Sequence, residues 1–371
     1  MSSRNGELKK LPADKPSVEK PTSLIQKWKN YKFGTEYDQL WLLIIVVVVA
    51  IVVCTILELE DVRSKLLAHP DPKLKPWSDL WKLFGMACLT FLIKKGIYLA
   101  MDPIFDARLK LSNFADHDAR LERVHDYVFG IFFYGFATVF AFYTYWGNPN
   151  IPTLLGGTGE GLFYWRNWPH LPVESQPFKY VEWYYPVQMG YHFHNLVHQG
   201  GCKSHRKTYI EMVLHHLLTW VLIFYSYYTN TIAFGVTVLM VHDVGDFVMN
   251  IGKVVRDLQL LEGKIVDFMY LSIVLSWLYP RVIIAWLSYI PAGMMLSRDC
   301  SVMPKGVCDY VDPTKYIGIV FLPWLLLILS LMNFYWIILI IGVGCEKKKQ
   351  GGYVAAFQGE QASLNVGVKK E

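Results

Sequence analysis

The sequence predicts an all-α membrane protein, a polytopic bundle of about eight transmembrane helices around a central cavity. Of its 371 residues, 53% are hydrophobic, and the mean hydropathy is +0.26. Three runs without a charged residue, at 40–57, 127–146 and 316–345, contain 18, 20 and 30 residues. Because about 20 apolar residues cross the hydrocarbon core of a bilayer, runs of this length predict membrane spans.

Polar or charged segments divide the chain into eight expected spans. The first and last are uncharged runs, and the seventh is expected to be broken. The fifth and sixth meet at a short polar break, Tyr-Thr-Asn-Thr at 228–231, which predicts a helical hairpin. In chain order, the spans cover about 40–57, 78–100, 124–146, 181–199, 209–228, 231–255, 265–297 and 316–344.

The two ends of the chain read as polar tails in the cytosol. Residues 1–38 contain eight Lys or Arg and no apolar core behind a basic head, so a cleaved signal peptide is not expected. Residues 346–371 form a second basic tail. Between them we expect an N-terminal transmembrane pair over 39–106 and a larger helical domain with the cavity over 107–345.

The basic residues between the spans support this orientation, because cytosolic loops carry an excess of Lys and Arg. The 59–77 loop, which is basic but falls on the opposite side, fits less well, so a seven-span arrangement with a miscalled first helix stays open. The residues that fit the cytosolic side are Lys203, Arg206, Lys207, Lys253, Arg256, Lys264 and Lys347 to Lys349.

Charge and cysteine content restrict the function classes. The formal charge of +5 is explained by the tails and cytosolic loops and does not indicate nucleic-acid binding. The six cysteines make no metal spacing, and no metal site is expected. Cys300 and Cys308 share one predicted lumenal loop, where a disulfide would form in an oxidising compartment. Two unpaired loop thiols are the alternative.

An imidazole and a carboxylate are expected at one depth in the membrane. His215 lies fourteen residues before Thr229 of the hairpin turn, and Asp243 lies fourteen residues after it. At a rise of 1.5 Å per residue, both are about 21 Å from the turn. Ionisable side chains at such depth are costly and usually face a bundle interior or an aqueous cavity. We therefore place the chemistry at His215, Asp243 and the nearby Asp246.

Three consecutive spans each carry one polar stripe at helical spacing, which predicts that they enclose a cavity. His216 is turned about 100° from His215 and is expected in a supporting or neighbouring-helix contact. Hydrogen bonding between helices is the alternative for His192, His194 and His198. The stripes are Gln188, His192, Asn195 and Gln199; Glu211, His215 and Thr219; and Asp243, Asp246, Asn250 and Lys253. Arg281, alone in an apolar segment, is expected to pair with a carboxylate.

These segments resemble the Lag motif of ceramide synthases, in the wider family of TLC-domain membrane proteins. The matching segments are LHHLLT, SYYTN, GVTVLMVHDVGD and the lysine of NIGK, within a resemblance that covers about residues 107–281. The sequence departs from the family pattern at Ala233, at Asn250 and at His125, where Arg, Glu and Trp are usual. No homeodomain-like insertion lies between the first two spans.

The resemblance implies a sphingoid base N-acyltransferase in the endoplasmic reticulum membrane, which joins a fatty acyl-CoA to a sphinganine-like base. It implies that His215 acts as base or as acyl acceptor, with His216, Asp243 and Asp246 beside it. No cofactor is expected, since acyl-CoA is a substrate. The expected substrate-binding residues at the cavity are His242, Gln188, His192, Asn250 and Arg281. Lys203, Arg206, Lys207, Lys253 and Arg256 are placed to meet the coenzyme phosphates. For any of these five, a simple positive-inside role is the alternative.

Other functions and partners stay open. A TLC-domain protein without catalysis, for lipid sensing or transport, is the first alternative. A di-metal lipid hydroxylase is the second, although eleven His in scattered positions are few for two coordination spheres. A homodimer, a heterodimer or a small regulatory subunit is compatible with the sequence. An extended acyl chain starting at His215 is expected to reach the lumenal end, near 290–295 and 316–321.

Overall fold

The computed structural model is helical throughout the part of the chain that it describes. The chain divides into two compact units, Met1–Leu43 and Ile44–Glu371. All contacts between helices described below lie within the second unit. The described residues are 36–68, 74–111, 117–145, 153–155, 180–202, 209–261, 264–296 and 317–350. Within them, each regular element is a helix, as the sequence predicts.

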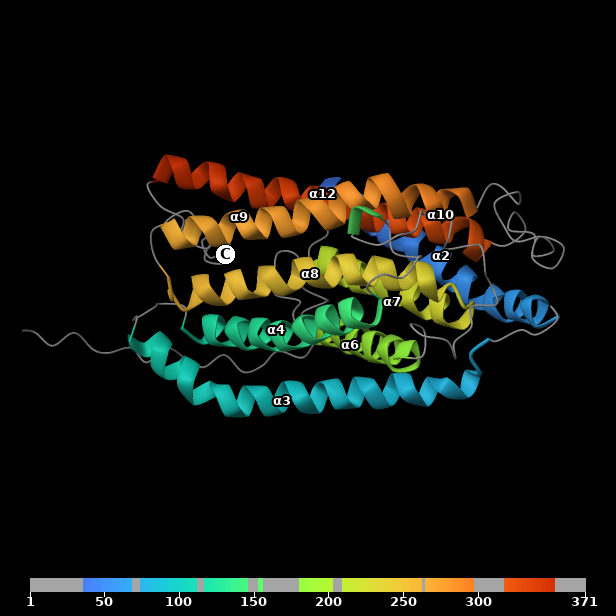
Figure 1. Ribbon diagram of the computed structural model, residues 1–371, viewed down its shortest axis with the longest axis horizontal. Helices are drawn as coiled ribbons and strands as arrows, with labels where there is room; N and C mark the ends of the chain where they lie inside the picture. Colours follow the sequence, from blue (N-terminus) through green and yellow to red (C-terminus); the bar gives the residue numbers. More distant parts are fainter. Residues whose placement is uncertain are drawn as a thin grey trace, which may run out of the picture. The chain divides into compact units, whose positions relative to one another are not determined.

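Long helices make up most of the elements (Figure 1). In chain order they are α2 (Glu36–Leu67), η1 (Trp77–Asp79), α3 (Leu80–Leu111), α4 (His117–Tyr145), η2 (Thr153–Leu155), α6 (Val181–Cys202), α7 (Tyr209–Tyr228), α8 (Ile232–Asp257), α9 (Lys264–Leu278), η4 (Tyr279–Tyr289), α10 (Ile290–Leu296) and α12 (Ile317–Gln350).

Within the described residues, six helical segments are long and apolar enough to cross a bilayer, as expected for a multi-pass membrane protein. Of the eight expected spans, those at 40–57 and 181–199 fall outside this set, although α2 and α6 cover both as helices. The count of eight stays a prediction. The six segments are Trp77–Lys110, His117–Thr144, Tyr209–Tyr228, Ile232–Asp257, Lys264–Met294 and Leu322–Cys345.

Helix α2 extends well past the expected end of the first span at residue 57. The expected loop at 59–77 is therefore wrong in its first part, since residues 59–67 continue the helix. Arg63 is buried there and donates hydrogen bonds to the carbonyl oxygens of Tyr228 (2.6 Å) and Lys75 (2.7 Å). Its guanidinium also lies over the Trp77 ring. Arg63 is thus bound within the helix bundle and does not lie in a loop. Its charge therefore does not argue against the orientation predicted from the positive-inside rule.

Close packing joins α3, α4, α6, α7 and α8. Figure 1 shows α4 beside α8, where the contact between helices is most extensive, and α3 lies against both α4 and α6. At Gly190 a Cβ would lie 2.6 Å from the Cβ of Met86, so only glycine lets α6 approach α3 this closely. The core between α6, α7 and α8 includes Tyr185, Met189 and Tyr227, all fully buried.

The predicted hairpin between α7 and α8 is present, and its turn is tight. Asn230 adopts a left-handed conformation (φ 59°), which asparagine tolerates better than most residues. The Thr229 N–H and hydroxyl both donate to the Tyr225 carbonyl, at 2.9 and 2.8 Å. Tyr227 donates to Asp79 at 2.7 Å, which ties this end of α7 to the start of α3. The turn is therefore fixed by neighbours rather than exposed.

The expected break in the seventh span takes the form of a π-helical segment. Helices α9 and α10 continue into η4 without an interruption of the chain. Pro280 lies in the first turn of η4, and Arg281 follows it. Wide turns of this type leave the α-helical register and are frequent at functional sites. Here the segment carries Arg281, whose guanidinium pairs with Asp246 of the pocket described below.

Both tails should be on the cytosolic side of the membrane. They are basic, and an even number of spans returns the chain to the side on which it began. We expect protease added to sealed microsomes to remove an epitope tag from either end. The sequence has no Asn-x-Ser/Thr acceptor, so natural glycosylation cannot substitute for this experiment. Protection of the N-terminal tag alone would require an odd number of spans.

Candidate active site

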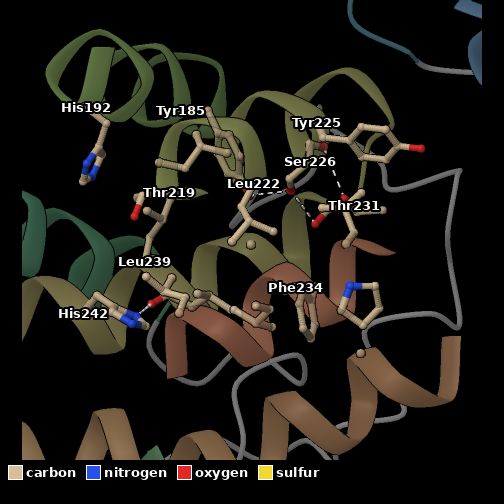
Figure 2. A pocket seen from close by; sticks show the side chains of 18 of the residues that line it. Tyr185, His192, Thr219, Leu222, Tyr225, Ser226, Thr231, Phe234, Leu239 and His242 are labelled. Carbon is tan, nitrogen blue, oxygen red and sulfur yellow. Dashed lines mark hydrogen bonds between the residues drawn. The ribbon is translucent and has the colours of Figure 1, made fainter. Parts of the chain in front are cut away.

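One pocket lies among α6, α7, α8, α10 and α12 (Figure 2). It holds about 1090 Å³ of space free of protein atoms, open solvent included, and its walls are mainly apolar. Five ionisable residues that the sequence singles out gather at it: His192, His215, His242, Asp243 and Asp246. Figure 2 shows His192 and His242 at one end of the cavity, and Thr231 and Phe234 toward the opposite end.

His215 reaches the pocket from the middle of α7. Its ring packs edge-on against Trp336 of α12, with 5.1 Å between ring centres. Its Nδ1 is buried and has no hydrogen-bond partner among the described residues. Buried polar atoms are normally paired, so an unpaired imidazole nitrogen at a cavity wall is available to a ligand.

Asp243 lies across from α7 on α8 and is held by neutral donors. It is 1% exposed, and its Oδ2 accepts hydrogen bonds from Gln188 Nε2 (2.7 Å) and the Tyr184 hydroxyl (3.1 Å). Gln188 also donates to the Tyr184 oxygen at 3.1 Å. Within the described part of the chain, the two side chains that donate hydrogen bonds to Asp243 are both uncharged. A buried carboxylate without an ion-pair partner favours a cationic ligand.

Asp246 has a different environment because it forms an ion pair with Arg281. Its Oδ2 lies 2.8 Å from Arg281 Nη2. Arg281 is 1% exposed, donates to the His242 carbonyl and lies over the Trp277 ring, 3.9 Å from the ring centre. A Cβ at Gly245 would lie 2.9 Å from Arg281 Nε, so glycine leaves space for the guanidinium. The Asp246 carboxylate is therefore neutralised by a cation, whereas the hydrogen-bond partners of Asp243 are neutral.

The hydrogen bonds of His242 determine its tautomer. Its Nδ1 lies 2.7 Å from the Val238 carbonyl, which can only accept, so Nδ1 carries the proton. Its Nε2 then accepts from Asn333 Nδ2 at 2.9 Å, while the Asn333 oxygen faces Arg281 at 3.5 Å. Both ring nitrogens are thus in use. His242 lines the pocket, but it is not placed as a free base.

His216 is not among the residues that line the pocket, in line with its 100° rotation from His215. It lies next to His215, with ring centres 5.3 Å apart, and next to His192 of α6, at 6.3 Å. The Nδ1 atoms of His192 and His216 are buried without a hydrogen-bond partner in the described structure. The three rings form a continuous imidazole group that begins at the cavity.

The other predicted site residues lie at varying distances from the pocket. Asn250 donates to the Asp246 carbonyl at 2.8 Å and so stabilises α8 rather than a ligand. Lys253 lies over the Tyr127 ring, 5.3 Å from its centre. The remaining predicted residues fall outside the described ranges: Lys203, Arg206 and Lys207, and the cysteines Cys300 and Cys308. Among described residues, no three His, Cys, Asp or Glu are arranged to hold a metal ion.

Three residues of the site are not predicted from the sequence. Tyr184 lies one turn before Gln188 on α6, a spacing that could have extended the polar stripe. Asn333 is an amide within the long apolar helix α12, and its isolation could have marked it. Trp336 gives no such signal, because an aromatic residue in an apolar span is unremarkable without knowledge of its neighbours.

The far end of the pocket is lined by the hairpin turn and by α10 and α12. Thr229 and Thr231 contribute hydroxyl groups near the turn, and Gly293 lies beside Phe234 and Pro323 in the wall. Because Thr229 lies fourteen residues after His215 on one helical rod, the pocket follows α7 for roughly 21 Å. Its shape suits a long apolar chain whose reactive end lies at the histidines.

Comparison with known proteins gives one family and several relatives. Residues 123–342, more than half of the chain, match the family model described as TLC domain. Ceramide synthase LOH2 of Arabidopsis thaliana is 23% identical over 310 residues, which cover 80% of this chain and 96% of the plant protein.

Two further relatives match shorter stretches. Ceramide synthase 4 of Mus musculus is 25% identical over 178 residues, 48% of this chain and 40% of the mouse protein. Sphingosine N-acyltransferase lag1 of Schizosaccharomyces pombe is 30% identical over 122 residues, 32% of this chain and 30% of the yeast protein. The chain thus spans nearly all of the plant relative and less than half of the other two.

Proposed function

The chain belongs to the TLC-domain family, and on that premise we propose that it is a ceramide synthase, which transfers an acyl group from a fatty acyl-CoA to the amine of a sphingoid base. One observation carries the proposal: a long apolar pocket has, at one end, His215, whose Nδ1 has no hydrogen-bond partner among the described residues, together with the carboxylate of Asp243. The names of the relatives agree with this chemistry.

His215 is the catalytic residue in this proposal. Its imidazole attacks the thioester carbonyl, the C–S bond breaks, and coenzyme A leaves as the thiol after taking a proton. The amine then attacks the acyl-imidazole, and the imidazole leaves as the amide forms. Direct attack by the amine, with His215 as the general base, is the alternative. In either sequence, acyl-CoA and the base are the only substrates, and no cofactor or metal is required.

Asp243 binds the ammonium group of the sphingoid base, and Asp246 supports the site through Arg281. The neutral donors Tyr184 and Gln188 orient the Asp243 carboxylate and leave its charge available to a cation. Asp246, already neutralised by Arg281 at 2.8 Å, has less charge to offer. This assigns different roles to two carboxylates that lie one helical turn apart.

The acyl chain occupies the apolar length of the pocket. A C–C bond of about 1.5 Å advances an extended chain by about 1.25 Å per carbon, so roughly 21 Å holds about sixteen carbons. The coenzyme remains at the opposite end, toward the predicted cytosolic loops with Lys203, Arg206 and Lys207. By analogy with its relatives we place the protein in the endoplasmic reticulum membrane, with a dimer or a regulatory subunit compatible with it.

Replacing Gly293 by leucine should shorten the preferred acyl chain. A Cβ at this position would lie 3.4 Å from Phe234 Cζ and 3.8 Å from Pro323 Cβ, which is ordinary van der Waals contact. Alanine therefore fits, whereas the three further carbons of leucine extend into the pocket and displace about two to four chain carbons. Product chain lengths are measured by mass spectrometry with mixed acyl-CoAs. Gly293→Ala is the matched control, and an unchanged profile in active Gly293→Leu would place chain selection elsewhere.

The direct test of function uses purified full-length protein, sphinganine and a panel of acyl-CoA thioesters. Ceramide formation that depends on both substrates, read by mass spectrometry, is the expected result. Binding of lipid without turnover, across the whole panel, would instead support the alternative of a TLC-domain protein for lipid sensing or transport. Metal analysis of the same preparation tests the di-metal hydroxylase alternative.

A further inference from the structure

Helix α2 contributes a residue to the pocket, although it lies outside the matched domain. Val62 lines the cavity together with Thr229 and Thr231 of the hairpin turn. Its side chain is fully buried, at 0% exposed. The match to the TLC domain begins at residue 123, whereas α2 ends at Leu67. A segment that the family model does not contain therefore closes part of this cavity.

Arg63, the next residue, shows at which end of the pocket Val62 lies. Its Nη1 donates a hydrogen bond to the carbonyl oxygen of Tyr228 at 2.6 Å, and Tyr228 directly precedes Thr229 in the turn. The turn is about 21 Å from His215 along α7. Val62 is therefore at the end of the pocket opposite His215.

Further contacts fix α2 against the turn. Arg63 Nη2 donates to the carbonyl oxygen of Lys75 at 2.7 Å, and the guanidinium carbon lies 4.6 Å from the centre of the Trp77 ring and 5.3 Å from that of Tyr228. Trp77 Nε1 donates to Glu60 of α2 at 2.7 Å, and the Trp77 and Tyr228 rings stack with their centres 4.5 Å apart. Because hydrogen bonds from a charged donor are stronger than neutral ones, these contacts hold Val62 in one place.

The buried residues of α2 lie on one face of the helix. They are spaced alternately by four and three residues, which keeps them on one side. The opposite side includes Leu57, which is 75% exposed. The buried residues, each at most 6% exposed, are Val48, Val52, Thr55, Leu59, Val62 and Leu66. Of these six, Val62 is the one that lines the pocket, so the others provide controls on the same face.

We propose that Val62 forms the end wall of the acyl site and so limits acyl-chain length, and that Arg63 is the positioning residue that holds this wall at the hairpin turn. The inference rests on the proposed function, which fixes the reactive carbonyl at His215. With one end of the chain held there, the terminal methyl group of a longer chain meets the Val62 side chain at the other end. At about 1.25 Å per carbon, a change in the size of this side chain alters the number of carbons that fit.

The test measures the ceramide chain lengths that purified full-length protein makes from sphinganine and an equimolar mixture of saturated acyl-CoAs. Val62→Ala removes two methyl groups, so the most abundant product should become about two carbons longer. Val62→Phe extends further into the cavity and should shorten this product by about two to four carbons. Val52→Phe is the matched control. It makes the same change on the same buried face, about 15 Å along α2, and should leave the chain lengths unchanged.

The role of Arg63 is tested by the spread of the product chain lengths. Arg63→Met loses both hydrogen bonds to carbonyl oxygens, so α2 is held less firmly and the range of chain lengths should widen. Arg63→Lys keeps a charged donor for the Tyr228 carbonyl and should restore part of the narrower range. A loss of total turnover with an unchanged range in both variants would mean that Arg63 only stabilises the fold.

A second measurement requires no turnover. An acyl-CoA of about sixteen carbons with a diazirine at its terminal carbon should label the peptide that contains Val62, as the length of the pocket along α7 predicts. The same probe with the diazirine beside the thioester should label α7 near His215 instead. Terminal labelling confined to other helices would contradict the end-wall assignment, whether or not ceramide forms.

Failure of this inference and failure of the proposed function are distinguishable. Absence of ceramide from the unsubstituted protein would reject the proposed function. Ceramide of unchanged chain length from both Val62 variants would reject the end wall alone. If Val62→Phe does not fold, Val62→Ala decides the question, since a smaller side chain leaves the pocket open. Equal shifts in Val52→Phe and Val62→Phe would also overturn the inference, because the packing of α2 in general would then set the chain length.

Discussion

Replacing His215 by alanine is expected to abolish ceramide formation while the protein stays inserted and folded. The substitution removes the imidazole that faces the thioester and leaves the apolar pocket and both carboxylates in place. Loss of a nucleophile or general base lowers turnover by about 10³-fold or more. The rate is measured with purified protein, sphinganine and acyl-CoA, beside a thermal unfolding curve in the same detergent.

The matched control for this variant is His117→Ala. His117 begins α4 away from the pocket and pairs with Asp106 at 3.1 Å and Asp118 at 2.9 Å. Its loss tests whether removing any histidine is enough to reduce turnover. Comparable activity of His215→Ala and His117→Ala, both folded, would contradict the catalytic assignment of His215.

If the reaction passes through an acyl-imidazole intermediate, the mass of the protein should change. Protein incubated with acyl-CoA alone should gain one acyl group, and His215→Ala should not. The adduct should persist in Asp246→Asn, because Asp246 pairs with Arg281 and lies outside the bond-forming step of the first half-reaction. An unshifted mass under trapping conditions, in protein that makes ceramide, would favour direct attack by the amine.

Helical arithmetic on a hairpin explains why much of the site is predictable. The equal spacing of His215 and Asp243 about Thr229 depends on one turn position and one rise per residue, and the structure places both residues at one pocket. The position of His216 behind His215 follows from the same period. Such relations join residues that are close together along the chain, so they can be predicted from the sequence alone.

Contacts between distant segments are not predictable in this way. Asn333 and Trp336 reach the site from α12, which packs against α7, η4 and α9, and no periodicity in α12 selects its register. Arg63 was expected in a loop because charges follow residue 57, but burial against Tyr228 and Trp77 lets α2 continue. In both cases the contacting residues lie on different helices, and some of them are more than a hundred residues apart in the sequence.

The roles of individual polar residues also depend on partners that spacing cannot identify. His242 was expected to bind substrate, yet Val238 and Asn333 engage both of its nitrogens. Arg281 was expected to pair with a carboxylate, and the structure selects Asp246 over Asp243. The choice matters for chemistry, because it leaves Asp243 as the carboxylate able to receive a cationic amine.

The Arg281–Asp246 pair should stabilise the fold strongly, and breaking it from either side should be costly. Arg281 is 1% exposed and joins η4 to α8 through Asp246 and the His242 carbonyl. Arg281→Met leaves the Asp246 carboxylate without a cationic partner. Asp246→Asn leaves the Arg281 guanidinium without an anionic partner. Removing one partner of a buried pair costs about 3–5 kcal/mol of unfolding free energy.

The double variant Arg281→Met/Asp246→Asn distinguishes an ion pair from two independent contacts. Because neither Arg281 nor Asp246 is then left charged without its partner, we expect the double variant to recover at least about half of the loss of either single variant, since neutral replacements of buried pairs are often well tolerated. Unfolding free energies are measured by denaturant titration in detergent. Arg108→Met, which removes a half-buried guanidinium bound to the Gln259 carbonyl at 3.1 Å, should cost less than about 1.5 kcal/mol. Additive losses in the double variant would mean that Asp246 and Arg281 stabilise the bundle separately, and Asp246 would then be as free as Asp243 to bind the amine.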